Sequence, residues 1–144
     1  MRRALALARR AGRWGEVPVG AVVVDEAGRT LAAEHNRSLS SCDPTAHAEI
    51  LALRQAASAM GNYRLGGVTM YVSLEPCPMC AGALVWARVK RLVFGAWDSK
   101  AGALGSVVDL ANQPELNHHP LVEGGLLAEE SAALLKEFFA KRRK

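Results

Sequence analysis

Two short motifs hold the side chains of this sequence that are best suited to chemistry. Cys77 and Cys80 are two residues apart in the segment EPCPMC (75–80). That spacing occurs in redox disulfides, in halves of structural zinc sites and in catalytic metal sites, and it leaves the three alternatives open. His47 and Glu49 stand two residues apart in a separate segment and add an imidazole and a carboxylate at a second expected helix start.

The two motifs together favour a catalytic metal. If the two helix starts face each other, His47, Cys77 and Cys80 offer one nitrogen and two sulfur ligands suited to Zn²⁺. Three protein ligands leave the fourth tetrahedral position to water, which is typical of a catalytic zinc site. Zinc lowers the pKa of such a water toward neutrality, and Glu49 is a nearby carboxylate that can accept its proton. The set therefore predicts hydrolytic displacement at an electrophilic carbon.

Other residues of the same types are expected to have simpler roles. Cys42 lies in the loop before the first motif and is not expected to close the site as a fourth ligand. His118 and His119 are expected at the surface or in a loop. Glu75 is interpreted as a local hydrogen-bond acceptor that orients the cysteine turn, and not as a second catalytic acid.

Alternating strand-like and helix-like segments must position these motifs. Apolar and β-branched runs predict strands at 17–26, 29–36, 68–74, 90–96 and about 121–125. Helical periodicity and start signals predict helices at about 1–13, 45–60, 76–87 and 126–143, with one further turn near 106–111. The first two strands form an antiparallel hairpin, and the strand–helix–strand run from 68 to 96 predicts a right-handed crossover between parallel strands. The last helix is expected to turn Leu127, Leu134, Leu135 and Phe138 toward the core.

The predicted fold class is therefore α/β, with a sheet of about five strands covered by helices on both faces. The 144 residues fit a single domain, 1–144. No apolar run reaches the roughly 18–20 residues of a membrane span. Three cysteines are too few for a disulfide framework, which favours a reducing, cytoplasmic location. The net charge of +4, with basic runs near the start and at 141–144, permits a nucleic-acid partner.

The motifs and their flanks resemble one known family. His47-x-Glu49 with Pro76-Cys77-x-x-Cys80 matches the zinc deaminase signature H-x-E…P-C-x-x-C. Nearly the whole chain is similar to the bacterial tRNA-specific adenosine deaminases of the cytidine/deoxycytidylate deaminase-like superfamily. Further matching blocks are EVPVGAV (16–22), HNR (35–37), DPTAHAEI (43–50), NYRL (62–65), EPCPMCAGAL (75–84), VFGAWDSKAGALGS (93–106) and FFAKRR (138–143).

The resemblance implies a three-layer α/β/α cytidine-deaminase-like fold with a mixed five-stranded sheet, a homodimer, and one Zn²⁺ per subunit. It implies hydrolysis of adenosine to inosine at the wobble position (34) of a tRNA anticodon, in which a zinc-bound hydroxide attacks C6 of a flipped-out adenine. Glu49 is implied to move the proton from the water to the ring nitrogen and then to the departing ammonia. The alternative is a free-purine (guanine) deaminase of the same superfamily, because such enzymes share DPTAHAE- and PCPMC-like stretches.

The resemblance also implies the contacts to the anticodon stem-loop. It places Asn36 against the flipped base, the Ala48 backbone amide near the ring edge, and Val19 as an apolar wall. It places Asp98 and Lys100 among the contacts to flanking nucleotides. The residues implied to meet the anticodon loop are Arg37, Phe139, Arg142 and Arg143.

Two positions depart from what the resemblance implies. Trp97 stands directly before Asp98, where a polar or basic residue is expected, and Cys42 occupies a loop position where no thiol is expected. The aromatic side chain at position 97 is therefore expected to change the contacts to the flanking nucleotides.

Overall fold

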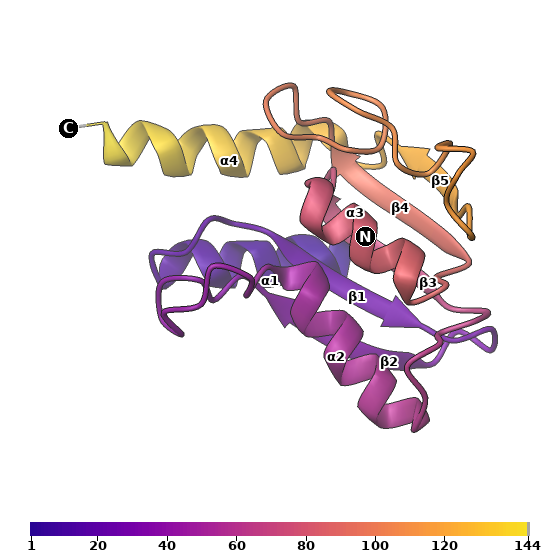
Figure 1. Cartoon of the computed structure of the whole chain (residues 1–144). Coiled ribbons are helices and arrows are strands. Elements are labelled where there is room, and N and C mark those ends of the chain that lie inside the picture. The colour runs from indigo at the N-terminus through magenta and orange to yellow at the C-terminus, as the bar shows by residue number, and fades with distance from the viewer. Residues whose placement is uncertain (144) are drawn as a thin grey trace.

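The computed structural model describes residues 1–143 as one five-stranded sheet between two pairs of helices (Figure 1). The helices are α1 (Arg2–Arg13), α2 (Ala48–Met60), α3 (Pro78–Trp86) and α4 (Ala128–Arg142), and the strands are β1 (Gly20–Val24), β2 (Thr30–His35), β3 (Thr69–Leu74), β4 (Arg91–Ala96) and β5 (Leu121–Gly124). The strand order is β2-β1-β3-β4-β5. Strand β1 pairs antiparallel with β2 and β3, whereas β3, β4 and β5 run parallel. The predicted α/β class, mixed sheet, hairpin and parallel crossover are all confirmed.

Helices cover both faces of the sheet. Helix α1 packs against β1, β2 and β3 and contacts α4, which packs against β4. On the other face α2 packs against β1 and β2 and contacts α3, as Figure 1 shows with α2 and α3 in front of the sheet. The central strands are almost fully buried because both of their faces are covered, and Met70, Val72, Leu92 and Phe94 have no exposed surface. Within residues 1–143, no helix has both the length and the apolar character needed to cross a membrane.

Both motif helices begin later than predicted. Asp43 Oδ1 accepts hydrogen bonds from the Thr45 amide at 2.8 Å and the Thr45 hydroxyl at 2.7 Å, and this turn delays the start of α2. His47 is extended (φ −72°, ψ 151°) and stands immediately before the helix. Cys77 is likewise extended (φ −73°, ψ 172°), so α3 begins at Pro78 and not two residues earlier. Each motif therefore has a metal-ligand candidate at the residue where extended chain becomes helix.

The helical turn predicted near 106–111 is wrong. Residues in this stretch form turns, with a single bridge between Leu104 and Asp109. Backbone amides of Leu104 and Ser106 donate to the side chain of Glu75. These two amides bond to the Glu75 carboxylate and do not make helical hydrogen bonds, so the chain forms turns around this side chain.

Helix α4 is less buried than its sequence pattern predicted. Leu127, Leu134, Leu135 and Phe138 are only half-buried, and Ser131 is the buried residue of this helix. Ser131 is buried because α4 approaches the sheet closely at Gly95, where an added Cβ would lie 2.5 Å from the Ser73 carbonyl oxygen and 3.2 Å from Ser131 Cβ. Beyond this contact, α4 extends past the sheet (Figure 1).

Candidate active site

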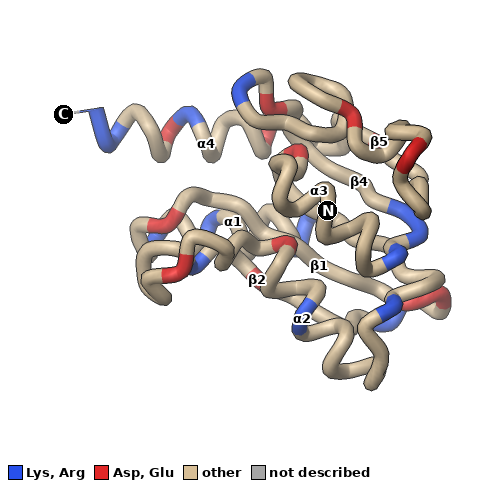
Figure 2. The backbone as a smooth tube through the Cα atoms, viewed as in Figure 1, with Lys and Arg blue, Asp and Glu red and all other residues tan. Residues whose placement is uncertain are grey.

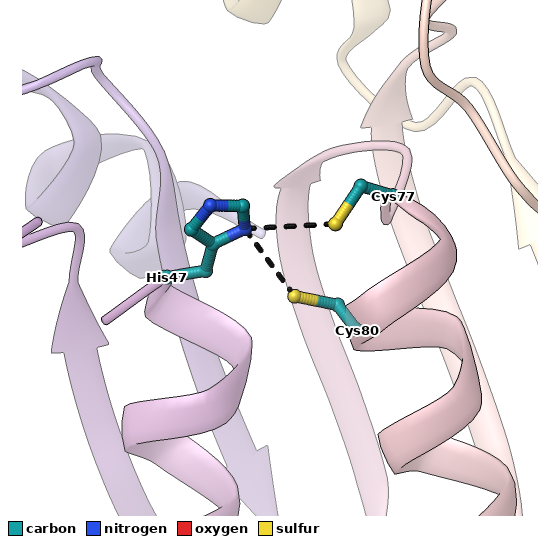
Figure 3. Close-up of side chains that lie close together, drawn as sticks. All are labelled: His47, Cys77 and Cys80. Carbon is teal, nitrogen blue, oxygen red and sulfur yellow. Dashed lines mark hydrogen bonds between the residues drawn. The ribbon is translucent and has the colours of Figure 1, made fainter. Parts of the chain in front are cut away.

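Three potential metal ligands converge where α2 and α3 begin. His47 Nδ1 lies 3.6 Å from Cys77 Sγ and 3.5 Å from Cys80 Sγ (Figure 3). The three ligand atoms all lie within 4.8 Å of one another. Strand β3 leads directly into the cysteine turn, and the loop after β2 leads into the histidine, so the sheet sets the separation of the two helix starts. The structure thus brings together the three ligands that the sequence predicted.

The spacing of these atoms fits zinc. A tetrahedral ion with Zn–S of about 2.3 Å and Zn–N of about 2.0–2.1 Å places nitrogen and sulfur ligands about 3.6 Å apart. The nitrogen–sulfur separations of 3.5 and 3.6 Å agree with that geometry. Cys42, in contrast, is exposed and its thiol lies against the Leu39 carbonyl. The site is therefore a three-ligand set with room for a fourth, non-protein ligand.

The pKa values of the two thiols are shifted in opposite directions. A hydrogen bond from Cys80 lowers the pKa of Cys77 to about 4, although its partial burial opposes this shift, and His47 adds a further bond. The pKa of Cys80 is raised by that same bond and by burial. A hydrogen bond to Cys77 raises the pKa of His47. The cluster therefore holds a thiolate ready to bind a cation, and a divalent metal would displace the remaining proton.

Glu49 lies beside the ligands at the wall of a cavity of about 500 Å³. Its side chain is only 4% exposed, and burial raises the pKa of its carboxyl to about 7. A carboxyl with a pKa near neutrality can both accept and return a proton at physiological pH. His47 and Cys77 line the same cavity, so the carboxyl and two of the ligands face one enclosed space.

Asn36 joins the cavity to the start of α2. Its Oδ1 accepts a hydrogen bond from the Ala48 amide at 2.7 Å. The Ala48 amide, implied by the resemblance to lie near a base edge, is thus already bonded to Asn36. The Asn36 Nδ2 group has no hydrogen-bond partner among residues 1–143, although the residue lines the cavity, and it is the group left to donate to a ligand. Val19, 5% exposed, also lines the cavity, where the resemblance implies an apolar wall.

Glu75 holds one rim of the cavity in place. Its carboxylate accepts hydrogen bonds from the amides of Asp98 (3.0 Å), Leu104 (3.0 Å) and Ser106 (3.1 Å) and from the Ser106 hydroxyl. Burial by itself raises the pKa of Glu75, but these bonds outweigh it and lower the pKa. Only glycine fits at position 102, since a Cβ there would lie 2.3 Å from the carboxylate. The interpretation of Glu75 as a hydrogen-bond acceptor, and not a second catalytic acid, agrees with these contacts.

Most of the remaining predicted residues lie in a second groove of about 620 Å³ next to the cavity. It is lined by Val17, Leu74, Trp97, Asp98, Ser99, Lys100, Leu135, Phe139, Arg142 and Arg143. Four of these residues, Val17, Leu74, Asp98 and Arg142, also line the cavity, so the two spaces adjoin each other. Arg37 lines neither space and pairs with Glu34 at 2.9 Å.

Glu16 is a buried cavity-lining residue that the sequence reasoning missed. Its carboxylate is 2% exposed, lines the cavity, and accepts hydrogen bonds from the amides of Leu39 (3.0 Å) and Ser40 (2.8 Å). It therefore holds the loop after β2 against the cavity, as Glu75 holds the loop after β4. A carboxylate directly before the apolar run at 17–24 was the available signal.

Comparisons with known proteins agree with this geometry. Residues 1–96 match the family described as the cytidine and deoxycytidylate deaminase zinc-binding region. The tRNA-specific adenosine deaminase of Haemophilus influenzae is 52% identical over 143 residues, which is 99% of this chain and 83% of that protein. A structure from a study of A-to-I editing by tRNA:A34 deaminases at the wobble position of transfer RNA superposes with a TM-score of 0.91 at 49% identity, covering 94% of this chain and 97% of that one.

A second group of solved structures is similar to a lesser degree. A guanine deaminase from Nitrosomonas europaea gives a TM-score of 0.80 at 30% identity, covering 95% of this chain and 81% of that one. Both scores indicate the same fold, and the identity is lower than that to the tRNA deaminase structure.

Proposed function

The chain belongs to the tRNA-specific adenosine deaminases within the zinc-binding cytidine and deoxycytidylate deaminase family, and we propose that it acts on the wobble adenosine of a tRNA anticodon. The observation that carries the substrate assignment is that the second groove adjoins the cavity and shares four lining residues with it. The cavity accommodates one base, and the groove adds the cations Lys100, Arg142 and Arg143 beside it. A free purine has no phosphates for such cations, whereas single-stranded RNA is bound by cationic backbone contacts.

In the reaction, water replaces the amino group at C6 of adenosine, giving inosine and ammonia. His47, Cys77 and Cys80 would hold one zinc ion, which when bound supplies Lewis-acid activation of the attacking water. We assign to Glu49 the proton transfers, first from the water to the ring nitrogen and then to the departing ammonia. Its burial at the cavity wall supports this role, because bulk water is kept away from the transferred proton.

Substrate positioning is assigned to the other residues that line the two spaces. Asn36 would donate from Nδ2 to the base, and Val19 would pack against its face. Asp98 and Lys100 would contact the neighbouring nucleotides. The residues assigned to the anticodon backbone are Phe139, Arg142 and Arg143, with Arg37 at a more distant position.

The proposal extends to assembly and location. A single continuous sheet supports one deaminase domain over the whole chain, and the free cysteines support a reducing, cytoplasmic location. We propose that a second copy covers the groove between α2 and α3, where Trp86 is 77% exposed and Tyr63 is 74% exposed. Light scattering tests this: wild type is expected as a dimer and Trp86→Glu as a monomer, and a monomeric wild type would contradict it.

The substrate assignment is tested by offering purified zinc-loaded protein two kinds of substrate. Anticodon stem-loops with a wobble adenosine are expected to yield inosine, and stem-loops with adenosine elsewhere in the loop are the matched control. Free guanine is offered in parallel and is expected to remain unchanged. Deamination of guanine without action on the stem-loop would establish the free-purine alternative instead.

A further inference from the structure

Trp97 is an exposed aromatic residue that the assigned reaction does not use. It follows β4 directly and is 55% exposed, although it is a large apolar side chain. Its ring meets the buried Phe94 ring edge-to-face, with centroids 4.6 Å apart and planes at 89°. An added Cβ at Gly124 would lie 2.6 Å from Trp97 Cζ2, so glycine makes room for the indole. The indole is thus supported from the protein side while much of it stays open to solvent.

The open side of the indole faces a groove with the chemistry of a single-strand binding surface. Trp97 and Phe139 both line the second groove, and Phe139 is 43% exposed. The cationic side chains of Lys100, Arg142 and Arg143 line it as well, and Asp98 is the one carboxylate among its described lining residues. Figure 2 shows Lys and Arg positions along α4 toward its C-terminal end. Aromatic faces beside cationic side chains bind bases and phosphates of single strands.

We propose that Trp97 stacks on a nucleobase adjacent to the target adenosine, making it a specificity-determining residue. The inference rests on the proposed function. When the target base enters the cavity, its neighbours must lie at the cavity mouth, and the second groove begins there through the shared Asp98 and Arg142. The three cations favour RNA as the occupant over a second copy of this chain, whose own net charge is +4.

The kinetic test removes the indole and the neighbouring base in combination. Trp97→Leu is expected to lower kcat/KM on an intact stem-loop by about 5- to 150-fold, the range of base–aromatic stacking. Trp97→Phe keeps an aromatic face and is expected to lose much less. Trp14→Leu removes a tryptophan that is 61% exposed and does not line the groove, and it is the matched control.

The same variants are then assayed on two further stem-loops, each with an abasic site on one side of the adenosine. On one of these substrates wild type and Trp97→Leu are expected to have equal kcat/KM, because the stacking partner is gone. An equal loss on the intact and both abasic stem-loops would overturn the proposal, as would full activity of Trp97→Leu on the intact substrate.

A fluorescence measurement decides the proposal independently of turnover. In Trp14→Phe/Trp86→Phe protein, Trp97 is the remaining tryptophan. Its emission is expected to be quenched by the intact stem-loop and much less by one of the two abasic stem-loops. If wild type binds the stem-loop but forms no inosine, the wobble assignment fails while this quenching still tests stacking. Unchanged emission on saturating intact RNA would exclude the stack.

Discussion

The zinc site and the second groove lie side by side, yet they are fixed in place in different ways. His47, Cys77 and Cys80 stand at the first residues of two helices packed on a buried sheet. The second groove is built from the loop after β4 and the C-terminal end of α4, where the side chains are mostly exposed. Chemistry that needs fixed ligand distances thus resides on rigid element ends, while the proposed RNA contacts reside on surfaces held by a few hydrogen bonds.

Removal of a zinc ligand tests the rigid region of the molecule and is expected to have the largest effect on activity. Cys80→Ser is expected to abolish activity and zinc binding, because two ligands hold the ion far more weakly than three. Stability is expected to fall too, since a metal at 100 times its Kd contributes about 2.7 kcal/mol to the folded state. Zinc content and thermal unfolding with and without chelator measure both effects. Cys42→Ser, at an exposed thiol outside the site, should keep zinc, activity and melting temperature.

The next largest effect is expected at Glu49. Glu49→Gln is isosteric and keeps all three ligands, so it should bind zinc and stem-loop normally while kcat falls by about 10²- to 10⁴-fold, the usual contribution of a general acid–base group. Single-turnover assays and zinc analysis separate these quantities. Glu129→Gln, on the exposed first turn of α4, is the control. Unimpaired turnover of Glu49→Gln would remove the proton-transfer role.

Glu75 connects the two regions and is expected to affect binding more than chemistry. Glu75→Gln replaces an acceptor of four hydrogen bonds by a group with one acceptor oxygen. Each charged hydrogen bond contributes about 1.5–3 kcal/mol, so the loop should loosen and KM should rise by about tenfold or more, with kcat changed less. Hydrogen exchange at the Asp98, Leu104 and Ser106 amides should accelerate together. Ser106→Ala removes one donor and should show a smaller effect; a fall in kcat alone would contradict this account.

A smaller effect is expected at the end of α4. Truncation after Ala140 removes Arg142 and Arg143 from the second groove. The slope of log K for stem-loop binding against log salt should become shallower by about 0.7 for each phosphate that the truncated protein no longer neutralises. Arg29→Ala, on the hairpin turn away from the groove, should leave the slope unchanged. An unchanged slope in the truncated protein would indicate that this end is an ordinary solvated helix terminus.

The smallest expected effect is the contribution of Glu16 to the pH dependence of the free energy of unfolding. Burial opposes ionisation of Glu16, but hydrogen bonds from Leu39 and Ser40 outweigh it and hold its pKa below the ordinary value. Its contribution to stability is therefore present above the unfolded-state pKa of about 4.3 and is lost as pH falls through the lower folded-state pKa. Urea unfolding between pH 7 and 3 should show a shallower acid loss of stability for Glu16→Gln than for wild type. Glu123→Gln, which removes an exposed ion pair, should follow wild type.

The same difference between the regions explains what the sequence could predict. The Cys77–Cys80 spacing and the helix start after His47 are local signals in the sequence, and the types of these residues specify a zinc-like ion. The start of α2 was predicted three residues early because the Asp43–Thr45 turn competes with helix formation, and the start of α3 two residues early because Cys77 is extended. The stretch near 106–111 was wrongly predicted as helical because the Ser106 amide, like that of Leu104 before it, bonds to Glu75, which is about 30 residues away in the chain.

The bond between Asn36 Oδ1 and the Ala48 amide has a consequence for altering this enzyme. One carboxamide secures the helix start next to His47 and, in the proposed function, donates its remaining hydrogens to the base. A substitution at position 36 intended to change base preference would therefore disturb the histidine ligand as well. Base preference and metal geometry are therefore coupled through Asn36. A replacement at this position that changes the specificity must also restore the hydrogen bond at the helix start.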